Sequence, residues 1–422
     1  MSRIISNFDS LATNQLRIDA LSIIEEGYRA IDTVSAMTSK ITLEDGTLSI
    51  QGHPYELSQY ERVVIIGFGK ASCKAAKELE RILGDFLTEG IVIDKHATKC
   101  DVVEVFEGTH PLPSPHNVEV SQKIADLAES LTEKDLAIVI VSGGGSALLC
   151  LPLSECEQGA LLYSELLKAG GNIKDLNTLR KHVSSIKGGG LAKMLHPATV
   201  VSLIFSDVPG DHFKDVASGP TYLDTTTISD AENLLVKHNV NEHFIFNETP
   251  KDEQVFTKVR NIPFISNKEA LWKMEAEGKR RGYEVIILGD EVYDSPDVFL
   301  KNAESLLKPK TMVIAGGELS IALSKSGGVG GRNLYIANQA LDIIGENDMF
   351  IAFASDGIDN KSVAAGAIAD ADTKKKLQEK NIDSKAYHEE NKDSELFMET
   401  GDAIITGDTG SNVSDLYLMI RN

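Results

Sequence analysis

The feature of this sequence that most constrains its fold is a regular alternation of short apolar runs with longer segments of helical periodicity. Short apolar runs bounded by glycine or polar residues are typical of buried strands, and the longer segments have the length of crossover helices. The alternation therefore predicts an α/β architecture of mostly parallel sheet. The expected core strands are Arg62–Ile66, Gly90–Ile93, Leu136–Val141, Thr199–Phe205, Tyr283–Leu288, Thr311–Ala315 and Met349–Ala354.

The length of the chain, 422 residues, is sufficient for two domains of ordinary size. After Asp224 the sequence becomes polar and irregular through Lys237–Asn261, and then the alternation resumes. We therefore expect a boundary near residue 240, with domains at 1–240 and 241–422. One long helix is expected from about Gln15 to Met37. The alternation of Ile41–Ile50 around an Asp-Gly pair predicts a β-hairpin.

Composition excludes some classes of partner. The chain has 42 Lys and Arg against 63 Asp and Glu, a formal net charge of -21. Such a charge argues against nucleic-acid and anionic-membrane partners, so an anionic ligand must be held by a local group of cations and amides. No apolar run is long enough to cross a membrane, and the four cysteines show no zinc spacing. We expect a cytoplasmic protein with reduced thiols.

A glycine-rich segment occurs in the C-terminal half of the sequence. Four of the five residues from Gly327 to Gly331 are glycine, and Arg332, Asn333 and the amphipathic segment Leu334–Ile344 follow. A flexible backbone before a helix N-terminus suits a phosphate or a carboxylate, although glycine clusters also occur as simple surface turns.

Two further glycine-rich loops follow expected strands in the N-terminal half. Gly67-Phe68-Gly69-Lys70 follows the first core strand, and Ser142-Gly143-Gly144-Gly145-Ser146 follows the third. Ligands of open α/β sheets bind at the carboxyl ends of the strands, so both loops are predicted to border one crevice. The amides from Ser142 to Ser146 are expected to bind nucleotide phosphates. A similar segment, Gly316-Gly317-Glu318, occurs in the C-terminal half.

The first loop also fits part of a dinucleotide-binding fingerprint. Gly67 and Gly69 have the spacing of its first two glycines, and Asp94 lies where a ribose-binding carboxylate is expected. This pattern would favour an NAD(P)H-dependent reductase. Two residues argue against that interpretation, because Ser72 replaces the third glycine and the Lys70 ammonium would crowd a pyrophosphate.

Acidic residues follow two expected strands. Asp207 follows Thr199–Phe205 and Asp356 follows Met349–Ala354, positions from which a carboxylate can bind Mg²⁺ or orient a hydroxyl group. Shortly before the strand that leads to Asp207, Asn177–His182 and Lys187 supply three cations and a histidine. This group forms either a cationic wall against phosphate or a solvated helix face.

Seven motifs in order resemble those of the class II glycerate 2-kinase family, whose C-terminal region is called the MOFRL domain and whose members are often labelled hydroxypyruvate reductase. The resemblance extends from about Asp19 to the C-terminus. The motifs are Gly67–Ser72, Ser142–Leu148, Asn177–Leu191, Ser206–Asp224, Gly316–Asn333, Asp356–Gly366 and Thr406–Leu416.

The resemblance implies a Rossmann-like N-terminal domain, a smaller α/β C-terminal domain and an active site in the cleft between them. It implies transfer of a phosphoryl group from ATP, with Mg²⁺, to the 2-hydroxyl of D-glycerate or a related short sugar acid. The family's catalytic lysine and arginine correspond to Lys70 and Arg332, and Gly69 and Asn333 are expected beside the substrate. Asp207 is assigned to Mg²⁺ or to the hydroxyl proton, with Asp356 as the alternative for either task.

Two positions depart from the family pattern. Leu334-Tyr335 replaces Gln-Glu after the Gly-Gly-Arg-Asn motif, and Ser114 replaces aspartate after His110-Pro111-Leu112-Pro113. Both departures bear on the identity of the acid. Two other functions stay open at this stage: an NAD(P)H-dependent hydroxypyruvate reductase, and a non-catalytic sugar-acid or nucleotide-binding protein. The expected partner is a small hydroxy acid, and a homodimer is one compatible state.

Overall fold

The chain forms two compact units in the computed structural model, which describes residues 3–210, 212–321 and 328–422. One unit consists of residues 36–208 and 212–264, and the other of residues 1–35, 209–211 and 265–422. We call them the parallel unit and the mixed unit, after their sheets. The division differs from the expected boundary near residue 240, because the chain leaves the parallel unit only after residue 264 and the N-terminal segment belongs to the mixed unit.

The sheet of the parallel unit has the strand order β6-β5-β4-β7-β8-β9, and the pairs from β6 to β8 are parallel. When these strands are numbered in chain order, their spatial order is 3-2-1-4-5-6, which is the doubly wound order of dinucleotide-binding folds. The expected Rossmann-like architecture is therefore confirmed. The strands are β4 (Arg62–Phe68), β5 (Glu89–Asp94), β6 (Val103–Glu107), β7 (Asp135–Ser142), β8 (Thr199–Phe205) and β9 (Val259–Ile265).

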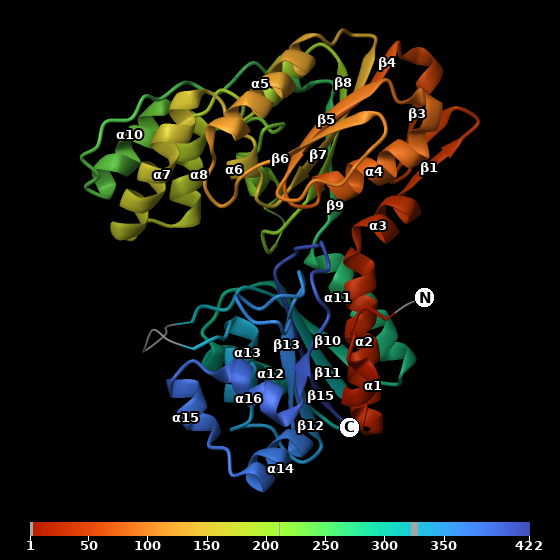
Figure 1. The fold of residues 1–422 in the computed structure, drawn as a ribbon, viewed down its shortest axis with the longest axis vertical. Coiled ribbons are helices and arrows are strands. Elements are labelled where there is room, and N and C mark those ends of the chain that lie inside the picture. The colour runs from red at the N-terminus through yellow and green to blue at the C-terminus, as the bar shows by residue number, and fades with distance from the viewer. Residues whose placement is uncertain (1–2, 211, 322–327) are drawn as a thin grey trace. The chain divides into compact units, whose positions relative to one another are not determined.

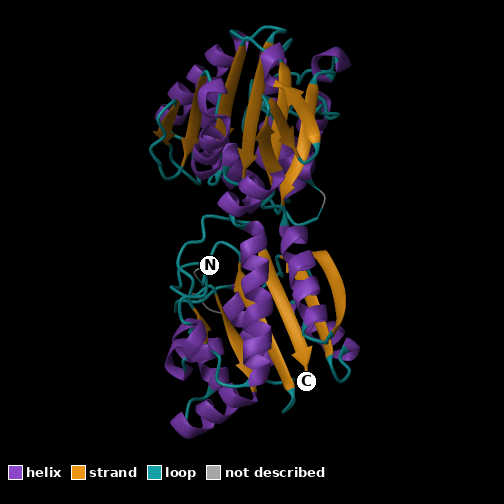
Figure 2. Cartoon of the chain, turned by 90° about the vertical axis from the view of Figure 1, so that its right-hand side faces the viewer, coloured by secondary structure: helices purple, strands orange, loops and turns teal. Residues whose placement is uncertain are grey.

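Helices cover this sheet, as Figures 1 and 2 show. Leu79 of α4 and Ile124 of α5 are fully buried. A separate apolar cluster forms between α7, α8 and α10 around Leu179 and Phe244. The helices of this unit are α4 (Ser72–Leu83), α5 (Pro115–Glu129), α6 (Gly145–Leu148), α7 (Leu153–Lys168), α8 (Ile173–His182), α9 (Gly190–Leu195) and α10 (Ile228–Lys237), with the short 3-10 turns η1 (Leu57–Gln59), η2 (Gly84–Phe86), η3 (Phe213–Ser218) and η4 (Glu253–Phe256).

The predicted hairpin is confirmed. Strands β1 (Ile41–Glu44) and β2 (Thr47–Ile50) pair antiparallel, and β3 (His53–Glu56) adds a third strand. The turn residues Asp45 and Gly46 have φ angles of 48° and 79°. Both angles are left-handed, as a two-residue hairpin turn requires.

The prediction of a single long helix from about Gln15 to Met37 is wrong. Helix α1 (Phe8–Leu11) precedes α2 (Gln15–Ile31), and α3 (Thr33–Lys40) follows after a break at Asp32. Asp32 is extended, with φ of -61° and ψ of 123°. Its Oδ1 accepts a hydrogen bond of 2.9 Å from the Ser35 amide, so its side chain caps the next helix instead of continuing the first.

A buried ion-pair network explains why α2 belongs to the mixed unit. Arg17 is fully buried, and its guanidinium lies 2.7 Å from the carboxylates of both Asp370 and Asp402. On the same helix, the ring of Tyr28 packs against Phe353 with a centroid distance of 5.0 Å. The N-terminal segment therefore covers one face of the second sheet.

The second sheet has the order β10-β11-β15-β12-β13-β14. β10 and β11 pair in parallel, and the other described pairs are antiparallel; the C-terminal strand β15 lies between β11 and β12. The three strands expected in this half, β10, β11 and β12, therefore run in the same direction, and β15, which we did not predict, separates β11 from β12. The strands are β10 (Glu284–Val292), β11 (Thr311–Gly317), β12 (Asp348–Ala354), β13 (Gly366–Asp370), β14 (Ala403–Ile404) and β15 (Asp415–Arg421).

Helices pack on both faces of this sheet (Figure 2). Phe350 of β12 packs in the cluster of α12, α13 and α16, whereas Phe353 faces α2. Figure 1 shows α11 beside α2. The remaining helices are α11 (Asn267–Arg280), α12 (Pro296–Leu306), α13 (Arg332–Ala340), α14 (Ala371–Lys380), α15 (Ser384–Glu389) and α16 (Asp393–Thr400).

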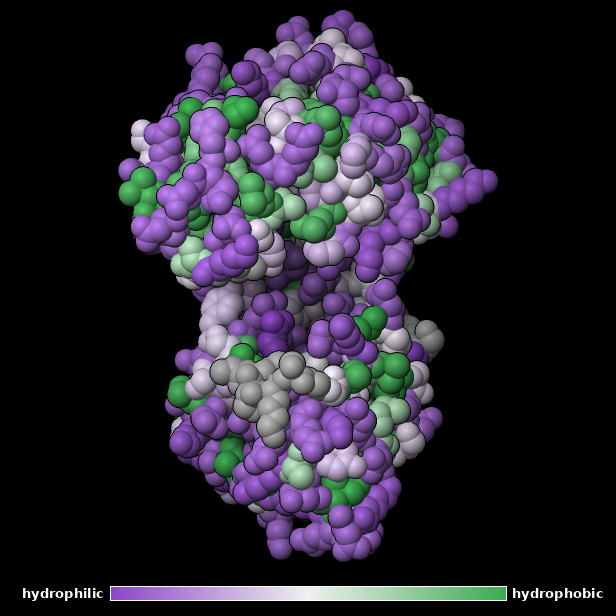
Figure 3. All heavy atoms as spheres, turned by 60° about the vertical axis from the view of Figure 1, so that its left-hand side comes forward, coloured by the Kyte–Doolittle hydropathy of each residue, from purple (hydrophilic) through white to green (hydrophobic). Residues whose placement is uncertain are grey.

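The face of the molecule in Figure 3 is mostly hydrophilic, with scattered apolar side chains, as the high net charge would suggest. Within the described ranges, no helix combines the length and the hydropathy that crossing a membrane would require.

Candidate functional site

The carboxyl edge of the parallel sheet brings together three of the predicted site segments. Lys70 follows β4, the loop from Ser142 to Ser146 follows β7, and Asp207 follows β8. Strands β4 and β7 flank the point at which the strand order reverses, where ligands of doubly wound folds bind.

Glycine allows the two loops to approach closely. Gly69 has a φ of 112°, and a Cβ at this position would lie 2.2 Å from the Ser142 Oγ. The Lys70 amide donates a hydrogen bond of 2.9 Å to the Gly143 carbonyl, and the Ala71 amide donates to the Ser142 Oγ at 3.1 Å. These hydrogen bonds hold the backbone that carries Lys70 against the second loop.

The same loop lies against Asp207. A Cβ on Gly143 would lie 2.1 Å from the Asp207 Oδ2, so only glycine permits this approach. Burial raises the pKa of the Asp207 carboxyl, and the charge of Lys70 opposes that shift. Lys70 itself is exposed and forms no ion pair with any described residue. The site thus holds a free cation near a carboxyl group of raised proton affinity.

The backbone of the second loop has donors available for an anion. Gly144 has a left-handed φ of 79°, and the amides of Gly143 and Gly144 donate no hydrogen bond to another described residue. On the far side of the loop, the Ser146 Oγ lies 3.1 Å from the Ser218 Oγ. Free amides beside a cation suit phosphate oxygens.

Asp94 is unavailable for the ribose contact that a dinucleotide fingerprint requires. It is 2% exposed, and its Oδ2 accepts a hydrogen bond of 2.9 Å from the amide of Cys73 in the first turn of α4. Its Oδ1 accepts from the Lys95 amide at 2.6 Å. The carboxylate therefore satisfies the N-terminus of α4, the position that a pyrophosphate occupies in dinucleotide-binding proteins.

Three of the four residues in the predicted group of three cations and a histidine form neither of the two arrangements considered from the sequence, a cationic wall or a solvated helix face. Lys181 pairs with Asp224 at 3.2 Å, and His182 is buried with its Nδ1 2.9 Å from the Asn247 carbonyl. Lys187 is 1% exposed and pairs with Glu155. These residues stabilise the fold through partners that are distant in sequence. The fourth, Arg180, forms no ion pair within the described ranges.

Arg332 lies in the mixed unit, at the first residue of α13. Its Nε donates a hydrogen bond of 2.8 Å to the Asp415 Oδ2, and its Nη2 lies 3.2 Å from the Glu318 Oε1. Burial lowers the pKa of Arg332, but the charges of Asp415 and Glu318 outweigh burial and leave the pKa above its usual value. The arginine is therefore oriented by two carboxylates.

The residues next to Arg332 extend this network. The Asn333 Nδ2 donates to Asp415 at 2.8 Å and to Asp359 at 3.2 Å, and the Leu334 amide donates to Asp359 at 2.8 Å. Burial, together with the charge of Asp415, raises the pKa of Asp359 to about 7, although these hydrogen bonds act in the opposite direction.

The glycine-rich segment before Arg332 is closely packed where it is described; Gly327 lies outside the described residues. Gly328 has a φ of 71°, and a Cβ on it would lie 2.3 Å from the Asn391 carbonyl oxygen. A Cβ on Gly331 would lie 2.1 Å from the Asp359 Oδ1. The Asn360 Nδ2 donates a hydrogen bond of 2.9 Å to the Gly330 carbonyl.

Asp356, the alternative carboxylate, lies in the turn after β12. Its Oδ1 accepts a hydrogen bond of 3.1 Å from the Ile358 amide. The carboxylates that contact Arg332 are Asp415 and Glu318. Asp415 was missed because it begins β15, a strand that we did not predict from the sequence.

The two departures from the family pattern have structural explanations. Ser114 is the N-cap residue of α5, ahead of Pro115, and its Oγ donates to the Asn117 Oδ1 at 3.0 Å. The Ser114 side chain makes no capping hydrogen bond to the helix amides, and an ionised aspartate could not donate to the Asn117 oxygen. Leu334 is fully buried in the core, and Tyr335 packs on His388 with a centroid distance of 4.1 Å.

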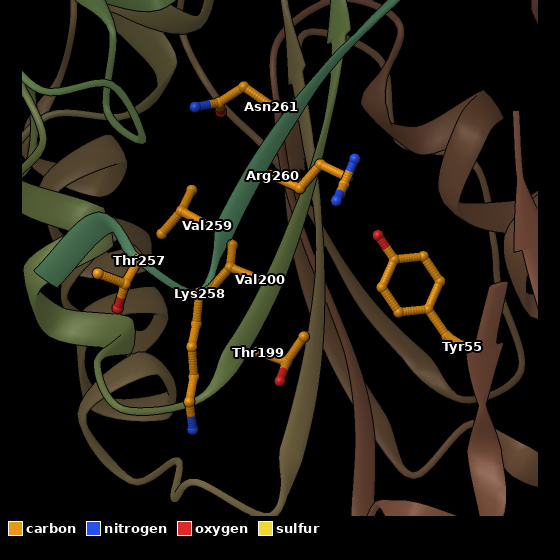
Figure 4. A pocket seen from close by; sticks show the side chains of 8 residues that line it. All are labelled: Tyr55, Thr199, Val200, Thr257, Lys258, Val259, Arg260 and Asn261. Carbon is orange, nitrogen blue, oxygen red and sulfur yellow. The ribbon is translucent and has the colours of Figure 1, made fainter. Parts of the chain in front are cut away.

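A cavity of about 510 Å³ lies elsewhere in the parallel unit (Figure 4). Thr199, the first residue of β8, lines it together with Tyr55, Lys258 and Arg260. The cavity is therefore at the amino end of a strand whose carboxyl end leads to Asp207. Among the described residues, no group of three or more His, Cys, Asp or Glu side chains has an arrangement suited to a metal ion.

Comparison with known proteins identifies the family of this chain. Residues 19–246 match a family described as a domain of unknown function, DUF4147, and residues 311–415 match the MOFRL family. A glycerate 2-kinase from Pyrococcus horikoshii is 31% identical over 96% of this chain and 97% of its own length. A D-glycerate 2-kinase from Thermotoga maritima is 32% identical over 85% of this chain and 90% of its own.

A solved structure of a glycerate kinase has the same fold as this chain. The crystal structure of a glycerate kinase from Thermotoga maritima has a TM-score of 0.85 and 29% identity, and covers 96% of this chain and 99% of that chain. Both domain matches, their order and the full-length similarity lead to one conclusion. The chain belongs to the glycerate 2-kinase family with a C-terminal MOFRL domain.

Proposed function

We propose that this protein is a glycerate 2-kinase, an enzyme that transfers a phosphoryl group from ATP to the 2-hydroxyl of D-glycerate or a closely related short sugar acid. The observation that carries the proposal is the 31% identity to a glycerate 2-kinase over 96% of this chain. The free cation, free amides and carboxyl group at the carboxyl edge of the parallel sheet supply the groups that such a reaction needs.

In the parallel unit, Lys70 and the amides from Ser142 to Ser146 bind the phosphates of the nucleotide. The transition state of phosphoryl transfer spreads negative charge over the transferred oxygens, so catalysis consists largely of positioning and electrostatic stabilisation. Lys70 suits this role because it forms no ion pair with a described residue, so no such pair must break when the ligand binds.

Asp207 performs one of two tasks: it accepts the proton of the substrate hydroxyl, or it binds Mg²⁺. The raised pKa of its carboxyl favours the first, because a carboxylate with a higher pKa is a stronger base. One half-buried carboxylate also fits Mg²⁺, an ion that usually takes one or two protein carboxylates and completes its shell with phosphate and water. When bound, the ion would neutralise charge on the phosphates.

In the mixed unit, Arg332 binds the carboxylate of the acid or stabilises the transferred phosphoryl group, with Asn333 beside it. A guanidinium can make two parallel hydrogen bonds to either group. We propose that Lys70 and Arg332 serve the same reaction, with Gly69 next to the substrate and Asp356 as the alternative carboxylate.

A coupled ADP-release assay over glycerate, threonate, erythronate and hydroxypyruvate tests the proposal. We expect ADP release from Mg-ATP only when a hydroxy acid is present, with glycerate the preferred acid. NADH oxidation by hydroxypyruvate without ATP turnover would instead support the reductase alternative. The homodimer stays a prediction for light scattering, and the cytoplasmic location stays a prediction for fractionation.

A further inference from the structure

The carboxyl edge of the parallel sheet carries more positive charge than the proposed mechanism uses. Lys95 follows β5, and His110 follows β6. Both belong to the same row of loops as Lys70, since β6, β5 and β4 are adjacent and parallel. A Cβ on Gly144 would lie 3.0 Å from the His110 Cδ2 and 3.2 Å from the Lys70 Cγ, so these two side chains meet over the second glycine loop.

Hydrogen bonds bring a further cation toward the same loop. The Asn177 Oδ1 accepts a hydrogen bond of 3.1 Å from the Ser218 Oγ, which in turn lies 3.1 Å from the Ser146 Oγ. Arg180 follows Asn177 by three residues on helix α8 and therefore shares its face. Its guanidinium lies 5.7 Å from the centre of the Tyr163 ring, which orients it without neutralising it.

The cations of this row are not held in ion pairs with described residues, although Lys70 interacts electrostatically with Asp207 and Arg180 with Glu155. Lys70, Lys95 and Arg180 form no ion pair within the part of the chain that the structure describes, although acidic residues outnumber basic ones in the sequence by 63 to 42. Burial, together with the charges of Lys70, Lys95 and Arg180, lowers the pKa of His110 to about 4. The imidazole is therefore neutral at neutral pH and can donate a hydrogen bond without adding charge.

We propose that Lys95, His110 and Arg180 form, next to Lys70, a subsite for a polyphosphate chain. The proposal rests on the function proposed above and assigns the non-transferred phosphates of the nucleotide to this subsite. Three cations and two free amides match the several negative charges of a triphosphate better than the single charge of a short hydroxy acid.

Calorimetric binding measurements in the absence of any acid substrate test this assignment. The probes are inorganic tripolyphosphate and the non-hydrolysable nucleotide AMP-PNP, both with Mg²⁺. We expect Arg180→Ala to raise the Kd for both probes by about tenfold, since a charged hydrogen bond is lost. The KM for ATP should rise to a similar extent, while the KM for glycerate changes less than twofold.

Matched variants separate this effect from misfolding and from a general loss of charge. Arg180→Met retains the aliphatic stem and should weaken both probes like Arg180→Ala, and Lys95→Ala changes an exposed side chain and should weaken them as well. Arg260→Ala removes the same charge from the cavity at the amino end of β8 and should leave both Kd values unchanged.

Three results would overturn the subsite: unchanged Kd values for both probes in Arg180→Ala and Arg180→Met, weaker binding of AMP-PNP alone, or a rise in the KM for glycerate alone. The second result would place Arg180 beside the nucleoside, and the third beside the acid. Tripolyphosphate binding does not depend on catalysis, so a protein that binds it through Arg180 but releases no ADP would refute the proposed function and leave the subsite standing.

Discussion

Lys70 and Arg332 differ in their exposure and in their pairing with carboxylates. Lys70 is exposed, forms no ion pair with a described residue and lies among other cations at the edge of the parallel sheet. Arg332 is half-buried and held by Asp415 at 2.8 Å and by Glu318 at 3.2 Å. One cation has its charge available for a ligand, whereas the other has a fixed orientation and a largely compensated charge.

This difference suggests a division of work. An uncompensated cation binds an anion without first losing a protein partner, which suits a strongly charged phosphate chain. A cation in a carboxylate network offers its remaining N–H groups in a fixed direction, which suits a small group that must be placed accurately. The following predictions test whether the two cations depend on charge and on geometry respectively.

The largest effect is expected at Lys70. Lys70→Ala should lower kcat by about 100-fold or more, equal to roughly 2.7 kcal/mol of transition-state stabilisation, with the fold intact. Steady-state kinetics and a melting curve measure both effects. Lys77→Ala, an exposed lysine of α4, is the control and should retain full activity. Wild-type turnover in Lys70→Ala would make Lys70 an ordinary surface charge.

At Arg332 the geometry should matter more than the charge. Arg332→Lys retains the charge but loses the planar group and its Nε bond to Asp415, so we expect kcat/KM to fall about 30-fold, or roughly 2 kcal/mol. A fall in kcat would assign Arg332 to the transition state, and a rise in KM for the acid would assign it to the bound carboxylate. Both constants within twofold of wild type would remove Arg332 from the site.

Asp415 should act as a positioning residue for Arg332. Its two oxygens accept hydrogen bonds from Arg332 and Asn333, and an asparagine can accept only through one of them. We expect Asp415→Asn to lower kcat about tenfold, and the effect should largely vanish in the Arg332→Lys background. Asp348→Asn breaks the comparable pair with Arg421 and serves as the control, with reduced stability but normal kinetics. Fully additive losses in the double variant would contradict the coupling.

The smallest effect concerns stability near Asp359. Its folded pKa of about 7 lies above the usual value near 3.9, so the folded state retains a proton that the unfolded state loses between these values. The stabilising contribution of this proton is present at low pH and is lost as the pH rises toward 7. Thermal denaturation from pH 5 to 8 should show the wild-type Tm falling by roughly 5 °C relative to Asp359→Asn. Parallel Tm profiles would show that Asp359 ionises normally in the folded protein.

Several features of both regions could be predicted from local sequence. The apolar runs that correspond to β4, β7, β8, β11 and β12 predicted where the strands end. The glycines after them predicted the loops that carry Lys70 and Gly143. Topological position then placed Asp207 at the same edge. These features depend on short-range signals, namely apolar length and glycine spacing.

Pairings between distant residues could not be predicted in this way. Nothing near Lys187 in the sequence indicates that its ammonium is buried against Glu155, so the sequence left open both a cationic wall and a solvated helix face. The antiparallel position of β15 between β11 and β12, which brings Asp415 to Arg332, depends on tertiary contacts. One signal was present but unused: the alternating pattern of Val103–Glu107 is typical of an edge strand and would have indicated the strand before His110.

The central claim is that the protein phosphorylates the 2-hydroxyl of a short hydroxy acid, and the phosphorus NMR spectrum of the product tests it most directly. After incubation of D-glycerate with Mg-ATP, we expect a monoester signal that is split into a doublet by the single hydrogen on C2. A triplet would show transfer to the 3-hydroxyl. A spectrum with unchanged ATP signals and no monoester, together with oxidation of NADH by hydroxypyruvate, would contradict the kinase assignment altogether.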